Sequence, residues 1–203
     1  MTSLREKQKA RRRSEILRAA RTLLEKEGFA RSSMEEIAAA AEVGVATVYN
    51  YFGTKGALLA AVLGPEFDEL FERGEQVVAE PPSKPATGVL GLTEIYAEIV
   101  KSWEDTDVLA AVIGPGLSAE PLLDTFTSDI ESRTIEQIQR LLSAYRDRGA
   151  ISTRQRVADG ARVVFYIFNQ HFIECVTRPE GSHRRLVRDI RPHVRFVLDA
   201  IST

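Results

Sequence analysis

The stretch that decides the fold runs from Glu36 to Lys55 and reads EIAAAAEVGVATVYNYFGTK. Its spacing predicts two short helices, at about 34–41 and 45–52, joined by a tight turn and followed at once by a third helix. The second short helix carries side chains that are able to touch phosphates and bases: Thr47, Tyr49, Asn50 and Tyr51. A second helix that enters the DNA major groove is the plan of a helix-turn-helix. The sequence therefore predicts a DNA-binding unit near the N-terminus.

This stretch resembles the DNA-binding domain of the TetR family of bacterial transcriptional regulators. In that family the turn and recognition helix follow a pattern like Ala-Gly-Val-Ser-x-x-Thr-Leu-Tyr-x-Tyr-Phe-x-x-Lys. This chain carries the matching residues Ala41, Val43, Thr47, Tyr49, Tyr51, Phe52 and Lys55, with Val48 in place of leucine. It departs at Glu42, where a turn glycine is usual, and at Gly44, where a capping serine is usual. A left-handed Glu42 would cost about 1 kcal/mol.

Helical spacing continues through nearly the whole chain, so we expect an all-α protein of about nine helices. The expected helices cover about 10–27, 34–41, 45–52, 106–113, 120–148, 154–177 and 182–201, with two more on either side of a loop at 80–85. Gly64-Pro65 is expected to kink the helix before that loop without ending it. This order is similar to the TetR layout. It implies a three-helix DNA-binding domain with a basic arm at 1–56, and a larger effector-binding and dimerisation domain at 57–203.

Composition limits the classes of partner. Residues 1–60 hold 11 Lys and Arg against 7 Glu, whereas the whole 203-residue chain has a net charge of −2. A basic head on an acidic body is typical of a protein whose head alone meets a polyanion. A single cysteine, Cys175, excludes an internal disulfide framework, and no apolar run reaches the roughly 20 residues of a membrane helix. We therefore expect a cytoplasmic protein with no membrane partner, cofactor or metal.

Helix geometry assigns roles within the DNA-binding unit. Val48 and Phe52 are four residues apart, so they are expected to face the core and to leave the other residues toward DNA. Asn50 is the main candidate for a hydrogen bond to a base edge, with adenine its favoured partner. The complete predicted set is Ser33, Gly44, Val45, Ala46, Thr47, Tyr49, Asn50, Tyr51 and Lys55.

The members of this set differ in chemistry. Val45 and Ala46 suit thymine methyl groups, whereas Thr47, Tyr49 and Lys55 suit phosphate oxygens. Ser33 heads a capping box, Ser33-Met34-Glu35-Glu36, so its hydroxyl serves the backbone cap, a phosphate, or both in turn. The basic arm consists of Arg11-Arg12-Arg13 together with Arg5, Lys7 and Lys9, and it either contacts DNA or is a solvated terminus.

The last two expected helices suggest an assembly. The helix at 182–201 has a heptad-like seam of Val187, Ile190, Val194, Val197 and Ile201, and the helix at 154–177 is apolar on more than one face. The TetR resemblance implies that these helices form a four-helix interface between two subunits. The alternative is that both helices only close the core of one protomer. We favour a homodimer.

The TetR resemblance also implies an effector cavity in the helical body. The predicted contacts are Phe67, Tyr96, Trp103, Phe126, Phe165, Phe168 and Asn169. Taken singly, each aromatic residue is more often part of a core than a ligand contact. Asn169, Gln170 and His171 interrupt an apolar stretch, which suits either a pocket that orients a ligand or an interface. His171, Glu174 and Cys175 have helical spacing but make a weak metal site.

Taken together, the residues and the resemblance predict a homodimeric regulator, most simply a repressor that a largely apolar small molecule releases from palindromic operator DNA. One rival is an enzyme with a helical body. The sequence has no GxSxG, phosphate-loop or HExxH motif, so we expect no enzymatic activity. A second rival is a regulator or architectural protein without an effector.

Overall fold

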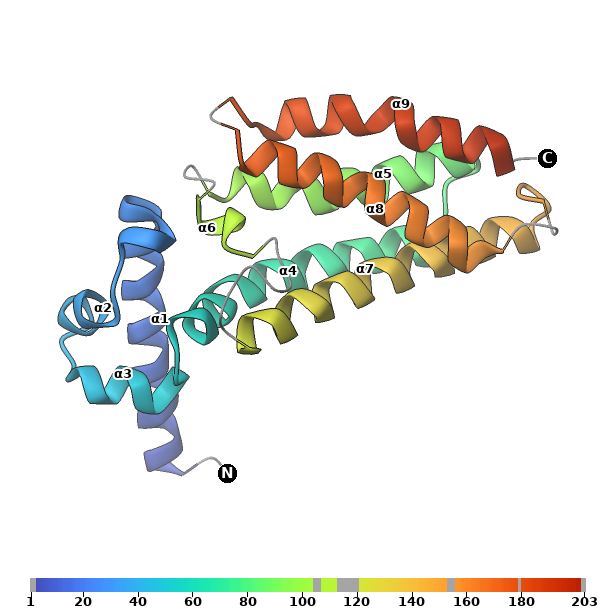
Figure 1. Ribbon diagram of the computed structural model, residues 1–203. Coiled ribbons are helices and arrows are strands. Elements are labelled where there is room, and N and C mark those ends of the chain that lie inside the picture. Colours follow the sequence, from blue (N-terminus) through green and yellow to red (C-terminus); the bar gives the residue numbers. More distant parts are fainter. Residues whose placement is uncertain (1–2, 104–106, 113–120, 153–155, 179, 202–203) are drawn as a thin grey trace. The chain divides into compact units, whose positions relative to one another are not determined.

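The protein is all-α, as the sequence predicted. The computed structural model describes residues 3–103, 107–112, 121–152, 156–178 and 180–201, which form nine α-helices, one 3-10 helix and no β-sheet (Figure 1). Both ends of the helix expected at 106–113 lie outside these residues. The chain divides into two compact units, residues 1–65 with 103–127 and residues 66–102 with 128–203. None of the described helices has the length and apolar character needed to cross a bilayer.

The first unit contains the predicted helix-turn-helix. Its helices are α1 (Leu4–Arg31), α2 (Met34–Ala40), α3 (Val45–Phe52), the start of α4 (Lys55–Ala79), the short α6 (Asp107–Ala110) and the start of α7 (Pro121–Asp147). The apolar stripe of Ile16, Ala20 and Leu24 on α1 is buried, as are Ile37 of α2 and Val48 of α3. These side chains form the core that fixes α3 against α1 and α2.

Helix α1 is longer than its periodicity predicted, because we expected it to cover only about 10–27. The hydroxyl of Ser3 accepts a hydrogen bond from the backbone N–H of Glu6 (3.2 Å), and the Glu6 carboxylate accepts one from the N–H of Ser3 (2.7 Å). This complete capping box starts the helix at Leu4. Gly28 takes φ 78°, as a helix-ending glycine would, yet a further helical turn continues to Arg31.

The turn between α2 and α3 has the left-handed residue that the sequence suggested. Glu42 has φ 53°, a region that side chains with a Cβ rarely adopt. Ser33 caps α2 by accepting from the N–H of Glu36 (3.2 Å). The predicted capping box is only half formed, because the Glu36 carboxylate accepts from the Ser33 hydroxyl (2.6 Å) and not from its backbone. Thr54 caps α4, accepting from the N–H of Ala57 (3.1 Å).

Glu42→Gly is expected to stabilise the protein. Glycine removes the steric cost of a left-handed residue, which outweighs the extra backbone entropy of the unfolded chain and leaves a gain of about 0.5–1 kcal/mol. Urea unfolding measures the change. Glu35→Gly is the matched control, since it removes the same side chain within helical backbone and should lower stability. Equal effects of the two substitutions would contradict the expectation.

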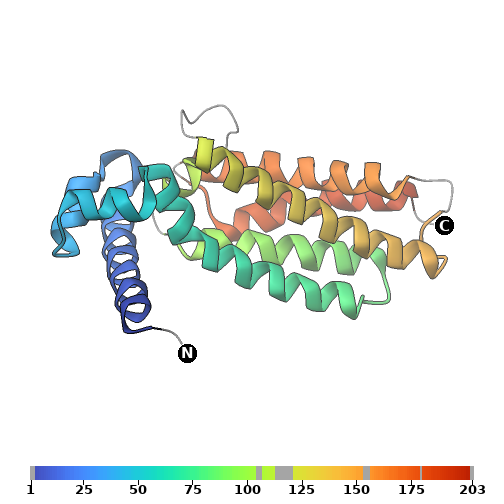
Figure 2. The ribbon, with the colours of Figure 1, turned by 90° about the horizontal axis from the view of Figure 1, so that it is seen from below.

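The second unit is a helical bundle. It contains the rest of α4, then α5 (Pro85–Ala97), the 3-10 helix η1 (Glu98–Lys101), the rest of α7, α8 (Val157–Val176) and α9 (His183–Ile201). Helices α5, α8 and α9 lie side by side (Figures 1 and 2). Helix α4 runs through Pro65 without ending, as predicted. Gly181 permits the tight α8–α9 turn, because a Cβ there would lie 1.7 Å from the Cys175 carbonyl oxygen.

Candidate functional site

Helix α3 separates its buried and exposed faces as predicted. Val48 is fully buried and Phe52 is 8% exposed, so both belong to the core. Ala46, Tyr49 and Asn50 are exposed, and Tyr49 keeps 45% of its surface in solvent. The outer face of α3 therefore presents a methyl group, a phenol and an amide, which together can meet base edges and phosphate oxygens. Val45 and Thr47 are half-buried at the edge of this face.

Three further residues of the predicted set frame this helix. Gly44 is the N-cap of α3 without a side-chain hydrogen bond, and the Ser33 hydroxyl is engaged in the cap of α2. Lys55 begins α4, and its ammonium group lies 4.3 Å from the centre of the Phe29 ring. That cation–π contact holds a positive charge at the first turn of α4.

Tyr51, which we predicted to face DNA, also contacts α1. Its side chain is half-buried, and its hydroxyl donates a hydrogen bond to the backbone carbonyl oxygen of Lys9 on α1 (3.3 Å). The guanidinium of Arg13 lies 5.5 Å from the centre of the neighbouring Phe52 ring. The structure therefore joins the start of α1 to the end of α3 through contacts that no local sequence signal could reveal.

This geometry agrees with comparisons to known proteins. Residues 16–62 match the model of a family described as bacterial regulatory proteins, tetR family. This part of the chain is a TetR-family DNA-binding region. The match covers α2 and α3 whole and includes Ser33 through Lys55, the range of all the predicted DNA-binding residues.

Two curated relatives are HTH-type transcriptional regulators. The chain is 27% identical over 139 residues to the HTH-type transcriptional regulator EthR of Mycolicibacterium smegmatis, a match that covers 68% of this chain and 63% of EthR. It is 37% identical over 73 residues to the HTH-type transcriptional repressor KstR of Rhodococcus jostii, covering 36% of this chain and 32% of KstR. Both matches thus span less than two thirds of the relatives' own length.

The fold also matches solved TetR-family structures over nearly the whole chain. The TetR-family repressor FadR of Thermus thermophilus, in complex with lauroyl-CoA, superposes with a TM-score of 0.74 at 21% identity. The superposition covers 94% of this chain and 95% of FadR. The helical body downstream of the family match therefore has the same fold as its TetR counterparts.

The predicted effector contacts are divided between the two units. Trp103 and Phe126 belong to the first unit, where Trp103 is buried and the Arg21 guanidinium lies 5.0 Å from its ring centre. The others belong to the second unit: Phe67, Tyr96, Phe165, Phe168 and Asn169. Within that unit the rings of Tyr96 and Phe168 meet edge to face, 6.1 Å apart. Phe165 and Phe168 are buried, while Phe67 and Asn169 are half-buried.

Sequence reasoning missed Gln137 of α7, the polar partner of Tyr96. The buried Tyr96 hydroxyl donates to Gln137 Oε1 (2.5 Å), and Gln137 Nε2 donates to the Phe71 carbonyl oxygen (2.9 Å) and to the Glu75 carboxylate. Burial raises the pKa of Tyr96, so the phenol stays protonated and remains a donor. A polar residue among Thr134, Ile138 and Leu141 on the inner face of α7 was the available signal.

Gln137 also lies at a surface groove. Arg140 forms two hydrogen bonds with the Glu75 carboxylate, the shorter of them 2.7 Å. A groove of about 270 Å³ adjoins this ion pair and is lined by Phe71, Glu72, Glu75, Arg133, Glu136, Gln137 and Arg140. A chain of hydrogen bonds thus leads from this groove through Gln137 to the buried Tyr96 hydroxyl.

Helices α8 and α9 keep apolar side chains on their outer faces. Tyr166 is 55% exposed, Val163 44% and Phe196 77%. A groove of about 420 Å³ lies beside Val163 and is lined by Leu142, Ile151, Arg156, Val157, Asp159, Gly160, Val163, Val197 and Ile201. By contrast, Ile190 and Val194 of the expected seam are buried within the protomer. For these two residues the alternative reading, that the seam closes the protomer core, is correct.

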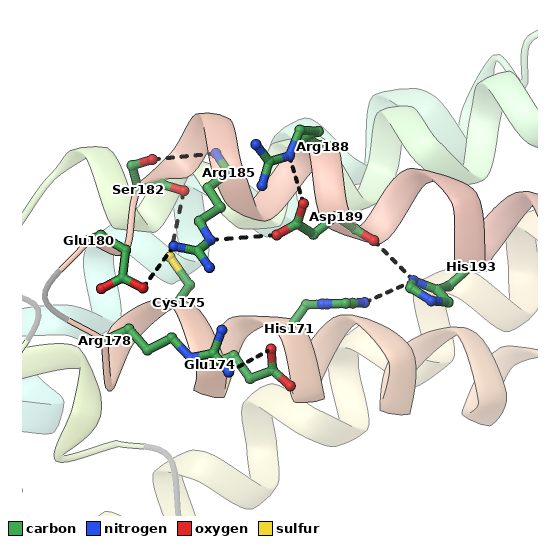
Figure 3. Close-up of polar contacts among 10 residues, drawn as sticks. All are labelled: His171, Glu174, Cys175, Arg178, Glu180, Ser182, Arg185, Arg188, Asp189 and His193. Atoms are coloured by element: carbon green, nitrogen blue, oxygen red, sulfur yellow. Dashed lines mark hydrogen bonds and ion pairs between the residues drawn. The ribbon is translucent and has the colours of Figure 1, made fainter.

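A polar cluster links α8 to α9 near the turn between them (Figure 3). His171 Nε2 and His193 Nδ1 share a hydrogen bond of 3.1 Å, and His193 Nδ1 also lies 3.0 Å from the Asp189 carbonyl oxygen. The Asp189 carboxylate pairs with Arg188 (2.7 Å) and Arg185 (3.6 Å). The Cys175 thiol donates to the Ser182 carbonyl oxygen (3.6 Å). Among the residues that the structure describes, no three His, Cys, Asp or Glu side chains form a metal-binding group.

The histidine pair predicts a fall in stability at acid pH. Burial, together with the neighbouring His193, lowers the pKa of His171 below its ordinary value of about 6.5. The unfolded chain therefore binds more protons as pH drops through that value, and the free energy of unfolding decreases. Thermal unfolding between pH 7 and pH 5 measures the effect. The melting temperature of His171→Gln should fall less over this range than that of the wild type. A difference in melting temperature between the two proteins that stays constant with pH would contradict the prediction.

Proposed function

We propose that this protein is a TetR-family, sequence-specific DNA-binding regulator that acts as a homodimer on an inverted-repeat operator. The single observation that carries the proposal is the outer face of α3. Ala46, Tyr49 and Asn50 point to solvent there, while Val48 and Phe52 fix the helix from the other side. Such a face fits the major groove of DNA.

The proposed DNA-binding set keeps the nine residues predicted from the sequence, and its members have different roles. Asn50 reads a base edge, and Val45 and Ala46 make apolar contacts with thymine methyl groups. The groups that suit phosphates are Ser33, Thr47, Tyr49 and Lys55, together with the backbone N–H at Gly44. Tyr51 stays in the set through its hydrogen bond to α1 and not through a direct contact with DNA. We also keep residues 1–56 as the DNA-binding domain and 57–203 as the effector-binding and dimerisation domain.

The proposed dimer uses the outer faces of α8 and α9. Tyr166 and Phe196 are large side chains with more than half of their surface in solvent, and the 420 Å³ groove beside Val163 and Val197 is mostly apolar. Exposed apolar surface of this kind marks an interaction site. A second copy of the chain brings the same side chains to a two-fold interface, since each subunit offers both the projecting rings and the groove.

The proposed effector is a largely apolar compound with one or two polar groups. FadR, a structural neighbour of this chain, was solved with lauroyl-CoA. We confine the proposed contacts to the second unit: Phe67, Tyr96, Phe165, Phe168 and Asn169, with Gln137 added. An effector can donate a hydrogen bond to the lone pairs that Tyr96 and Gln137 do not use in their mutual hydrogen bond, or it can displace that bond. Its binding favours a conformation of the body that holds DNA less tightly, which makes the protein a repressor released by its ligand.

Two experiments test this function. Genomic fragments that the purified protein retains should share an inverted repeat whose half-site centres are about one helical turn apart, or a multiple of it. Compounds that raise the melting temperature should weaken operator binding, and by linkage DNA should weaken compound binding by the same factor. Retention of random fragments alone would overturn the proposed operator recognition. Melting shifts that leave DNA affinity unchanged would overturn the proposed effector response.

If the protein were instead an enzyme, it would turn over a compound that it binds. We infer no catalytic role, because both curated relatives are named as transcriptional regulators. Turnover of any compound that stabilises the protein would reverse this inference.

A further inference from the structure

The basic arm continues α1 with a defined face. Residues 4–14 are exposed, yet they are helical from Leu4 onward because of the Ser3–Glu6 capping box. At about 100° per residue, Lys9 and Arg13 lie within roughly 20° of the direction in which Ile16, Ala20 and Leu24 are buried. They therefore prolong the inward stripe beyond the end of the apolar core.

On the same helix, Lys7 and Arg11 face the opposite way. They lie more than about 120° from that stripe by the same geometry. Arg11 is paired with Glu15 at 3.0 Å on this outer side. The arm therefore has two basic faces, of which only one lies toward α3.

Contacts with α3 fix the inward face. The Tyr51 hydroxyl donates to the Lys9 carbonyl oxygen (3.3 Å), and the Arg13 guanidinium lies 5.5 Å from the Phe52 ring centre. Phe52 is buried, and its ring centre is 6.2 Å from that of Tyr51. Tyr51 and Phe52, at the end of α3, thus contact Lys9 and Arg13, which lie one helical turn apart on α1. Asn50, the proposed base reader, immediately precedes them.

We propose that Tyr51 is a positioning residue that sets the basic arm beside the recognition helix, and that Lys9 and Arg13 then contact phosphates flanking the same half-site. The inference rests on the proposed DNA-binding function. Tyr51 acts through α1, because its hydroxyl is occupied by Lys9. The phosphate contacts come from the inward face of the arm, and Lys7 and Arg11 make none.

Neutralising one charge on each face of the arm tests the proposal that Lys9 and Arg13 contact phosphates. Lys9→Gln is expected to weaken operator and random DNA alike and to reduce the slope of log affinity against log salt by about 1. Lys7→Gln is the matched control and should leave the slope unchanged. Equal slopes for the two variants would overturn the assignment of faces.

A double-mutant cycle tests the role of Tyr51. Tyr51→Phe keeps the ring and removes one hydrogen bond, so DNA affinity should fall about 2- to 10-fold. In a Lys9→Gln, Arg13→Gln background the same substitution should cost nothing further, because the arm no longer carries the contacts that Tyr51 positions. Additive losses would show that Tyr51 touches DNA directly and would overturn the positioning role.

Hydrogen exchange gives a readout that needs no DNA. Tyr51→Phe should speed amide exchange in residues 5–13 while the melting temperature of the protein stays near that of the wild type. Unchanged amide exchange in these residues would overturn the proposal that Tyr51 positions the basic arm. Binding of the wild-type protein to an operator is measured first. If the wild-type protein binds no operator, the proposed function is refuted. If it binds an operator but amide exchange is unchanged in Tyr51→Phe, this inference alone is refuted.

Discussion

Replacing Phe196 with aspartate is expected to convert the protein from dimer to monomer and to weaken operator binding by about 100-fold or more. Phe196 is 77% exposed in the protomer, so the substitution costs the folded subunit little. In the proposed α8–α9 interface the same aspartate would be a buried, unpaired charge. A monomer also loses the gain of holding two half-sites at once, which commonly amounts to a factor of about 10² or more.

Sedimentation at micromolar concentration measures the change, with circular dichroism to show that the subunit stays folded. Leu4→Asp is the matched control, since Leu4 is 74% exposed on a different unit and should leave assembly intact. Val194→Asp serves as the opposite case, because Val194 is fully buried and its substitution should unfold the protomer. A wild-type monomer would refute the proposed dimer.

The helix-turn-helix was predictable because its signals are local. Ser33 and Thr54 are caps within three residues of the N–H groups that they accept from. Val48 and Phe52 share one face of a two-turn helix, so burying one side leaves Ala46, Tyr49 and Asn50 outside. The same local logic was available for α1, whose Ser3-x-x-Glu6 spacing is a capping box that the hydrophobic periodicity did not include.

Contacts between distant segments were not predictable from periodicity. The Tyr51–Lys9 hydrogen bond joins residues 42 positions apart, and Tyr96–Gln137 joins residues 41 apart. Periodicity shows that a helix has an apolar stripe, but not what covers it. In the apolar seam of α9, Val194 is buried in the core of the protomer. Phe196, two residues later, is the most exposed large apolar side chain of the same helix.

Two substitutions at the proposed DNA-binding site are expected to separate specificity from affinity. Asn50→Ala should weaken operator binding by roughly 1–3 kcal/mol and leave binding to random DNA nearly unchanged, because an amide reads a base edge only where the matching base is present. Asn50 is exposed on α3, so the substitution leaves the core of the unit intact.

Lys55→Ala should act on all sequences alike. Its ammonium group is held over Phe29 at the first turn of α4, where a positive charge suits a phosphate and carries no sequence information. The variant should weaken operator and random DNA by the same factor and reduce the salt slope by about 1. Titrating both variants against both duplexes at several salt concentrations measures these effects. Equal losses for Asn50→Ala on the two duplexes would show that Asn50 reads no base, and the specificity of α3 would then have to come from Val45 and Ala46, whose apolar contacts distinguish thymine methyl groups.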